Sequence, residues 1–282
     1  MYPPNFNYVV PSSLDEALTV LSESENAKIL SGGMSLIPLM KMRLVRPTAV
    51  VDISRIPGLD AITDEGDHIA IGALVKHADT ASSVLVGEHA TALAQAASTT
   101  ADIQVRNQGT TCGSIAHADL AADQPAAALA LGATMVAASV RGEREISASD
   151  FFVDTLTSAL ESDEILVRLE VPKGGKSAYA KLGRRGGDSD YPIAGAAVWV
   201  DASNGTVRDA RIAVTGVSSK PYLASASAQS VVGSDGSSDA IASAASHATD
   251  EVVVLEDLYG SVEYRSHLAT VYVKRALEDV LA

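Results

Sequence analysis

The stretch that decides the fold runs Ala27-Lys-Ile-Leu-Ser-Gly-Gly-Met-Ser-Leu-Ile-Pro-Leu-Met-Lys-Met-Arg43. Its first part, Lys28 to Ser31, predicts a short buried strand, which Gly32-Gly33 interrupts. From Leu36 to Arg43 the apolar residues recur at helical spacing. A strand that ends in paired glycines before a helix lets the backbone approach a ligand closely, and free amide groups there suit a phosphate or diphosphate. From this stretch alone, the alternative to a phosphate-binding loop is a plain turn with no binding role.

The residues on either side complete a β-α-β-α-β unit over residues 1–55. Phe6 to Val10 alternates like a strand, and Ala49 to Ile53 predicts another. Between them, Ser13-Leu-Asp-Glu16 has the form of a capping box, with Ser13 at the start of the helix and Glu16 three residues later. The apolar positions that follow at helical spacing are Leu14, Ala17, Leu18 and Leu21.

Composition excludes several classes of protein. The 282 residues are enough for two or three compact units. The net charge of −14 argues against a nucleic-acid surface, which needs a basic patch. No apolar run approaches the roughly 18 residues of a membrane span, and the first residues lack the features of a signal peptide, so we expect no integral membrane segment and a cytoplasmic protein. The one cysteine, Cys112, excludes an internal disulfide and a cysteine-only metal cage.

Residues 56–175 predict a second unit of mixed elements. A hairpin is expected around Asp64-Glu-Gly-Asp67, and a long polar loop over 102–119. Further helices are expected over 75–83, 88–98, 125–131 and 153–160, and strands over 134–140 and 164–171.

Residues 176–282 predict a separate α+β domain. Lys173-Gly-Gly-Lys176 has the character of a boundary. Three β-rich runs follow over 178–182, 193–200 and 207–217, and Asn204-Gly205 is a tight-turn signal between the last two. Three helices are expected over 224–232, 238–249 and 262–282. Strands followed by helices are typical of an α+β domain with a three-stranded antiparallel sheet and a helical bundle.

Three separated motifs together resemble one family. They are Ser31-Gly-Gly-Met-Ser-Leu-Ile-Pro-Leu-Met-Lys41, Val105-Arg-Asn-Gln-Gly-Thr-Thr-Cys-Gly-Ser-Ile-Ala-His-Ala-Asp119 and Asp257-Leu-Tyr-Gly-Ser-Val-Glu-Tyr-Arg-Ser-His-Leu268. In this order they resemble the FAD-binding medium subunits of molybdenum hydroxylases, such as carbon monoxide dehydrogenase and xanthine dehydrogenase. The resemblance implies a two-subdomain FAD-binding fold of the vanillyl-alcohol-oxidase type, with subdomains 1–55 and 56–175 followed by the domain 176–282.

The resemblance also implies the residues that hold FAD. Two loops would grip the diphosphate, the first from Ile29 to Leu36 and the second from Thr110 to Ser114. Thr110 and Ser114 would donate hydroxyl hydrogen bonds to phosphate, and Gly113 would allow close backbone approach. The members of the first loop are Ile29, Leu30, Ser31, Gly32, Gly33, Met34, Ser35 and Leu36.

Five further positions match the family outside these loops. Asp123 would bind the ribose or adenine of FAD, since a carboxylate would repel the diphosphate. Ala101 and Leu166 would contact the cofactor through backbone or apolar atoms. Lys181 and Tyr191 would lie close to the isoalloxazine ring, where a cation stabilises the anionic reduced flavin and a tyrosine shields one face. On the residues alone, a packed core aromatic is the alternative for Tyr191, and a solvated strand end is the alternative for Lys181.

The second loop departs from the family pattern. It usually reads Thr-Ile-Gly-Gly, and here it is Thr110-Thr-Cys-Gly113. We expect Cys112 to keep a negative φ and to pack behind the loop as a small buried residue rather than to act as a redox thiol. Leu120 replaces a common proline of the same segment.

The function that this resemblance implies is electron transfer within a heterotrimer. A large subunit would carry molybdopterin, and a small subunit two [2Fe-2S] clusters, from which electrons reach the FAD of this chain and then an external acceptor. The assembly would be a dimer of heterotrimers. Two alternatives are a free-standing FAD-dependent oxidase, which would need its own substrate pocket and base, and an assembly module that has lost FAD.

Overall fold

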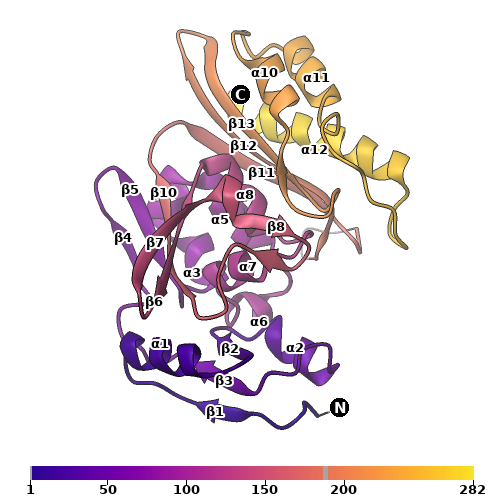
Figure 1. Cartoon of the computed structure of the whole chain (residues 1–282). Helices are drawn as coiled ribbons and strands as arrows, with labels where there is room; N and C mark the ends of the chain where they lie inside the picture. Colours follow the sequence, from indigo (N-terminus) through magenta and orange to yellow (C-terminus); the bar gives the residue numbers. More distant parts are fainter. Residues whose placement is uncertain (1, 187–189) are drawn as a thin grey trace.

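The first unit has the predicted order of elements. The computed structural model describes residues 2–186 and 190–282 (Figure 1). All pairings in the first sheet are parallel, in the order β1-β3-β2, so β2 and β3 end at the same edge. The elements are β1 (Asn7–Val9), α1 (Leu14–Glu23), β2 (Ala27–Leu30), α2 (Leu36–Lys41) and β3 (Ala49–Asp52).

The capping box is present with its second half displaced by one residue. The Ser13 hydroxyl accepts a hydrogen bond from the Glu16 amide at 3.2 Å, as predicted. The Glu16 carboxylate accepts from the backbone N–H of Ser12 at 2.7 Å, not from that of Ser13. Two donors at the start of α1 are therefore satisfied.

The second unit is built on a five-stranded antiparallel sheet in the order β4-β5-β10-β6-β7. The predicted hairpin is β4–β5, and the two predicted strands are β6 and β10. The strands of this sheet are β4 (Ile62–Asp64), β5 (His68–Gly72), β6 (Thr134–Ser139), β7 (Gly142–Ser147) and β10 (Ile165–Pro172). The helices of this unit are α3 (His77–Ser82), α4 (Val84–His89), α5 (Thr91–Thr99), α6 (Ile103–Arg106), α7 (Thr111–His117), α8 (Asp123–Leu131) and α9 (Ala148–Phe151).

Two predictions in this unit are wrong. The segment 102–119 is not a long loop: it contains α6 and α7, because Asp102 and Thr110 each cap a helix start by accepting an amide hydrogen bond. The segment 153–160 is not a helix: it forms the hairpin β8 (Phe152–Asp154) and β9 (Thr157–Ser158). Leu156 has a left-handed φ of 54° in the turn of that hairpin, which an α-helix does not allow.

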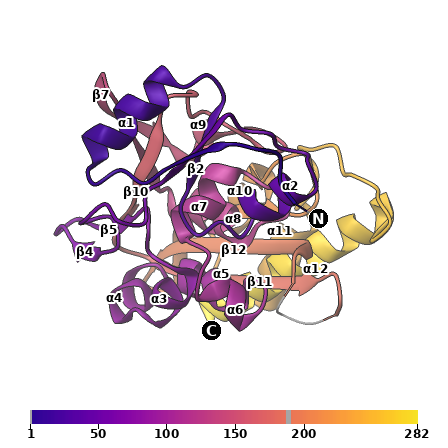
Figure 2. The same cartoon turned by 90° about the horizontal axis from the view of Figure 1, so that it is seen from below.

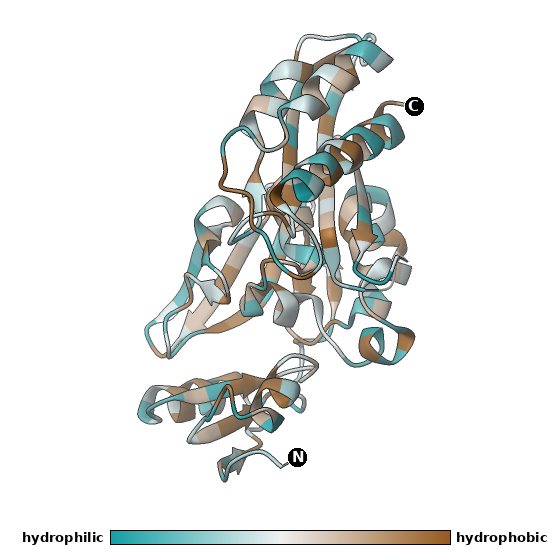
Figure 3. Cartoon of the chain, turned by 90° about the vertical axis from the view of Figure 1, so that its right-hand side faces the viewer, coloured by the Kyte–Doolittle hydropathy of each residue, from teal (hydrophilic) through white to brown (hydrophobic). Residues whose placement is uncertain are grey.

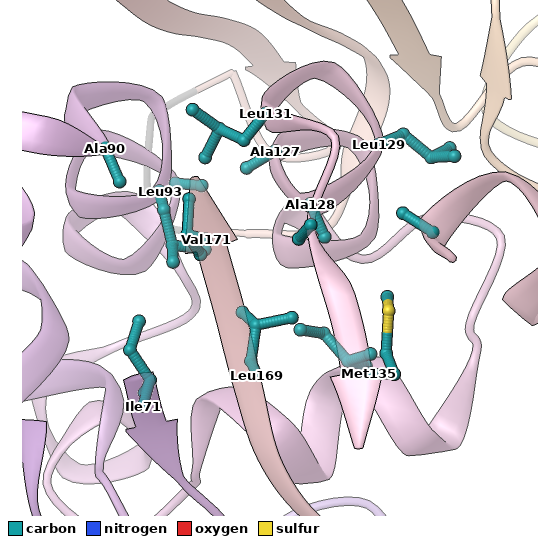
Figure 4. Packing of buried hydrophobic residues seen from close by; sticks show 14 of the residues in the cluster. Ile71, Ala90, Leu93, Ala127, Ala128, Leu129, Leu131, Met135, Leu169 and Val171 are labelled. Atoms are coloured by element: carbon teal, nitrogen blue, oxygen red, sulfur yellow. The ribbon is translucent and has the colours of Figure 1, made fainter. Parts of the chain in front are cut away.

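Alanine-rich helices fill the space between the two larger sheets. Every residue of α8 is buried, and its apolar residues lie in one cluster with α5 and the second sheet (Figure 4). Small side chains let these helices lie close to the strands on both sides. Residues labelled in Figure 4 include Leu93 of α5, Ala127 and Leu131 of α8, Met135 of β6 and Leu169 of β10.

The C-terminal sheet is antiparallel, but it has four strands instead of the predicted three. The order is β11-β12-β13-β14, and β14 is a two-residue strand that follows Pro221. Asn204 and Gly205 both have positive φ, 54° and 72°, which confirms the predicted tight turn. The elements are β11 (Lys176–Gly183), β12 (Pro192–Ser203), β13 (Thr206–Thr215), β14 (Tyr222–Leu223), α10 (Ser225–Val231), α11 (Ser238–Ser246) and α12 (Val262–Leu281).

Both faces of this sheet are covered. Along β12, Ala196 and Val198 face the cluster of α10–α12, whereas Ala197 belongs to the cluster of α5 and α8. Figure 3 shows the apolar residues of α12 gathered on one side of the helix. Each of the three larger sheets lies within one of the ranges 1–55, 56–175 and 176–282, which supports our proposal to divide the chain there.

Candidate functional site

The first predicted loop follows β2 at the carboxyl edge of the first sheet. Gly33 has a φ of +72°, which favours glycine. A β-carbon on Gly32 would lie 2.3 Å from the carbonyl oxygen of Gln108 and 2.7 Å from the Cα of Gly109. Gly32 is therefore required because the backbone of the second segment packs directly against the first loop.

The second predicted loop is the first turn of α7. Thr110 precedes this helix, and its hydroxyl accepts a hydrogen bond from the Gly113 amide at 3.2 Å. A β-carbon on Gly113 would lie 2.5 Å from the Thr110 Oγ1. The cap that Thr110 makes therefore leaves no room for a β-carbon at position 113, which explains why this residue is glycine.

Two hydroxyls join the loops. The Oγ atoms of Ser31 and Thr110 lie 3.0 Å apart, and Ser31 donates to the carbonyl of Ala73 at 3.1 Å. Because Ser31 has one hydroxyl proton, Thr110 is the donor between the two side chains. The structure thus brings together the two segments that the sequence analysis singled out.

The first loop leaves a row of backbone amides available. Within the described part of the chain, the backbone N–H groups of residues 32–36 donate to no protein acceptor. The carbonyl of Gly33 accepts from Ile37 at 3.0 Å, which starts α2. Successive amides around a left-handed glycine form a concave donor surface that binds anions. These residues fit the diphosphate of a dinucleotide cofactor.

Behind the second loop lies a buried hydrogen-bond network that the sequence analysis missed. Ser114 donates its hydroxyl proton to the Gln124 Oε1 at 2.9 Å. The Gln124 amide nitrogen donates to Thr100 at 2.7 Å and lies 3.1 Å from the His77 Nδ1. The single hydroxyl proton of Ser114 is therefore already donated to Gln124, so Ser114 can donate to a phosphate only if that hydrogen bond breaks. No spacing in the sequence connects Gln124 to His77.

His77 makes stability depend on pH. Its burial lowers the pKa from 6.5 to about 4, so the neutral imidazole is the folded form. Below the unfolded pKa the unfolded chain takes up the proton more readily, so stability falls as the pH drops from 6.5 toward 4. The expected loss is about 2 kcal/mol between roughly pH 7 and pH 5.

Urea unfolding of the His77→Asn variant at these two pH values tests this expectation. The substituted amide side chain retains an acceptor for Gln124 but cannot titrate, so the variant should lose about 2 kcal/mol less than the wild type on acidification. The exposed His267 provides the control variant His267→Asn, which should behave as wild type. If His77→Asn and the wild type lose the same free energy of unfolding between these pH values, His77 is not the cause of the pH dependence.

Asp123 and Lys181 form a buried ion pair. The Lys181 Nζ lies 2.8 Å from the Asp123 Oδ1, and their side chains are 1% and 5% exposed. Lys181 also donates to the carbonyls of Thr99 at 2.9 Å and Asp190 at 2.7 Å, and the Tyr179 hydroxyl donates to Asp123 at 2.5 Å. Burial raises the pKa of Asp123, and the Lys181 charge opposes that shift. Lys181 is thus not a solvated strand end, and a contact of Asp123 with ribose or adenine stays a prediction.

The other predicted residues lie around these loops. Ala101 has a left-handed φ of 43°, and its carbonyl accepts from Arg106 at 2.7 Å. Leu166 is buried in β10 next to a bulge. The remaining members of the first loop are the half-buried Ile29, Leu30, Ser35 and Leu36 and the exposed Met34.

Tyr191 lies at the surface, whereas Cys112 is buried. Tyr191 is 43% exposed, so it is not a core aromatic. It precedes β12, and Figures 1 and 2 show the start of β12 and α2 on the same side of the molecule. Cys112 is buried in α7, where its thiol donates to the carbonyl of Ile71 at 3.3 Å. Burial raises the pKa of this thiol to about 12, so it is a packing residue, as expected.

Comparisons with known proteins agree with this geometry. The family described as "FAD binding domain in molybdopterin dehydrogenase" matches residues 4–174, and the "CO dehydrogenase flavoprotein C-terminal domain" matches residues 177–280. The chain therefore belongs to the family of FAD-binding medium subunits of molybdenum hydroxylases. It is an oxidoreductase subunit with FAD as its cofactor, and the reading as a free-standing oxidase is the less supported one.

Individual relatives span nearly the whole chain. One is the 6-hydroxypseudooxynicotine dehydrogenase complex subunit alpha of Paenarthrobacter nicotinovorans, 38% identical over 100% of this chain and 96% of the relative. Another is the glyceraldehyde dehydrogenase medium chain of Sulfolobus acidocaldarius, 35% identical over 99% and 100%. Among solved structures, a carbon monoxide dehydrogenase from Hydrogenophaga pseudoflava that lacks the Mo-pyranopterin moiety superposes with a TM-score of 0.95, at 39% identity over 99% of this chain and 98% of that chain. Such relatives are subunits of multi-subunit complexes.

Proposed function

We propose that this chain holds the diphosphate of FAD on the backbone amides of residues 32–36 and passes electrons from a partner's [2Fe-2S] clusters to an external acceptor. The row of amides without an acceptor, next to the first turn of α7, is the observation that carries the proposal. Bound FAD supplies the redox chemistry, since it exchanges electrons both singly and in pairs. The residues of this chain bind and orient the cofactor.

The predicted site residues take two kinds of role in this proposal. Ser31, Gly32 and Thr110 hold the two segments together, so the amides of the first loop stay in place. Gly33 provides the left-handed turn that forms the donor surface. The residues proposed to contact or surround FAD are those of the loop 29–36 with Ala101, Thr110, Gly113, Ser114, Asp123, Leu166, Lys181 and Tyr191.

Tyr191 is the residue proposed to face the flavin ring. The Tyr191→Ala variant is expected to keep FAD but to change the visible absorption or the rate of flavin reoxidation, because an exposed aromatic ring would no longer cover one face of the flavin. Both quantities are measured on the purified, flavin-loaded protein. A spectrum and a reoxidation rate identical to those of the wild type would show that Tyr191 does not meet the flavin.

We also propose the partners. A large molybdopterin subunit and a small [2Fe-2S] subunit would complete the enzyme, assembled as a dimer of heterotrimers. The relatives named above act in complexes whose names refer to a nicotine derivative, glyceraldehyde and carbon monoxide. One medium-subunit fold accompanies all three, so we propose that the substrate is selected on the large subunit.

In the described part of the chain, no helix is long and apolar enough to cross a membrane. A buried, reduced thiol at Cys112 is compatible with the cytoplasm as the site of action.

The partners can be identified by affinity purification from the native cells through a tag on this chain. The expected result is two further subunits with molybdenum and iron present, and a flavin that is reduced anaerobically once the complex receives its substrate. A preparation of this chain alone, whose flavin is reduced directly by small organic substrates, would support the oxidase alternative and contradict the proposed partners.

A further inference from the structure

Tyr191 is an exposed side chain on a firmly held piece of backbone. Its amide donates to the Asp190 Oδ1 at 2.8 Å, and its carbonyl accepts from the Arg184 amide at 3.0 Å. The carbonyl of Asp190 accepts from the buried Lys181 at 2.7 Å. The position of the Tyr191 backbone is therefore fixed on both sides of the residue.

The ring of Tyr191 is held by a cation that contacts a second ring. The Arg184 guanidinium carbon lies 5.3 Å from the centre of the Tyr191 ring and 4.5 Å from that of Tyr259. The Nε atom of Arg184 is buried from solvent. A partly desolvated guanidinium is attracted more strongly to aromatic rings than a solvated one. Arg184 thus links Tyr191 to a residue 68 positions later in the chain.

Tyr259 is itself fixed by a tight turn. Asp257 and Gly260 exchange two backbone hydrogen bonds of 3.1 and 3.3 Å, and the Asp257 carboxylate accepts from the Tyr259 amide at 2.8 Å. The same carboxylate pairs with Arg265 at 2.5 Å. Arg265 is buried and donates to the carbonyl of Ile193 at 2.9 Å, two residues beyond Tyr191. The turn 257–260 is therefore tied to the start of β12, the strand that directly follows Tyr191.

We propose that Arg184 is a positioning residue: supported by Tyr259, it holds the ring of Tyr191 where that ring meets the flavin. This assigns a task to the segment 257–260, which the sequence motif contains and which the loops around the diphosphate do not use. The inference rests on the proposed function, because it takes Tyr191 to face the flavin. A ring that is already held in place loses less conformational freedom when the flavin packs against it.

The test compares three variants in the flavin-loaded complex: Arg184→Met, Tyr259→Leu and Tyr259→Phe. All are expected to retain full FAD content, since none touches the loops around the diphosphate. Arg184→Met and Tyr259→Leu should change the flavin spectrum and the reoxidation rate in the same direction as Tyr191→Ala. Tyr259→Phe keeps the ring and should match the wild type.

Arg275→Met is the matched control, because Arg275 lies 5.0 Å over the ring of Tyr272 in the same domain, away from Tyr191. It should leave both readouts unchanged. Wild-type spectra and rates in Arg184→Met and Tyr259→Leu, alongside a changed Tyr191→Ala, would overturn the role of Arg184 and leave the proposed function standing. A wild-type complex that contains no flavin would overturn both the role of Arg184 and the proposed function. Because Tyr259 is half exposed, Tyr259→Leu answers the question even where Arg184→Met fails to fold.

Discussion

The Gly32→Ala variant is expected to lose FAD. Its new β-carbon would lie 2.3 Å from the carbonyl oxygen of Gln108 and 2.7 Å from the Cα of Gly109, and both are backbone atoms that cannot move aside as a side chain does. The two loops must separate, which breaks the contact between Ser31 and Thr110 and displaces the amides of the first loop. Overpacking of this kind costs about 1–3 kcal/mol, so we expect FAD affinity to fall by roughly 5- to 150-fold.

The measurement is FAD content after gel filtration, followed by titration with added FAD. Gly87→Ala is the matched control, because its β-carbon meets no atom within 4 Å and its position in α4 suits alanine. This control should keep its flavin. Full FAD affinity in Gly32→Ala would show that the two segments do not have to touch in order to bind the cofactor.

The Lys181→Met variant is expected to destabilise the fold by about 3–5 kcal/mol. Lys181 pairs with the buried Asp123 carboxylate and donates to two backbone carbonyls. In the variant the two carbonyls lose this donor, and Asp123 loses its counter-charge while it keeps the Tyr179 hydroxyl. A buried carboxylate without a counter-charge must either stay desolvated or take up a proton, and both cost free energy. The free energy of unfolding in urea measures the effect.

Two comparisons make this second prediction specific. The double variant Lys181→Met, Asp123→Leu removes the orphaned charge, so it should recover part of the stability lost in the single variant. Lys274→Met removes an exposed lysine whose Nζ lies 3.8 Å from Glu278, and it should cost less than about 1 kcal/mol. A single Lys181→Met variant as stable as Lys274→Met would contradict the buried pair.

Local patterns in the sequence predicted most of the first unit and the C-terminal domain. The strand ending at Gly32-Gly33, the Ser13 cap and the Asn204-Gly205 turn are each determined by residues close together in the chain. The segment 102–119 is predicted to be a long loop, and it contains α6 and α7 instead. Its many polar residues suggest a loop, whereas Asp102 and Thr110 use their side chains to start helices there.

The contacts that assemble the site could not be predicted in the same way. Gln124 and His77 meet only because α3 and α8 both pack against α5, and no spacing in the sequence indicates that contact. The requirement for glycine at position 32 likewise comes from Gln108 and Gly109, more than seventy residues later. The family resemblance predicts which residues lie near the cofactor, whereas the physical reasons for glycine at positions 32 and 113 come from the packing around them.

The most direct test of the account is the cofactor content of this chain, purified in complex with the partners it binds. Flavin released by acid should be FAD, in about one equivalent per chain, and twin visible bands should persist through gel filtration. Gly32→Ala, purified in the same way, should be depleted of that flavin. A wild-type complex that contains no FAD, and that takes up none when FAD is added, would contradict the assignment of the amides of residues 32–36 to its diphosphate.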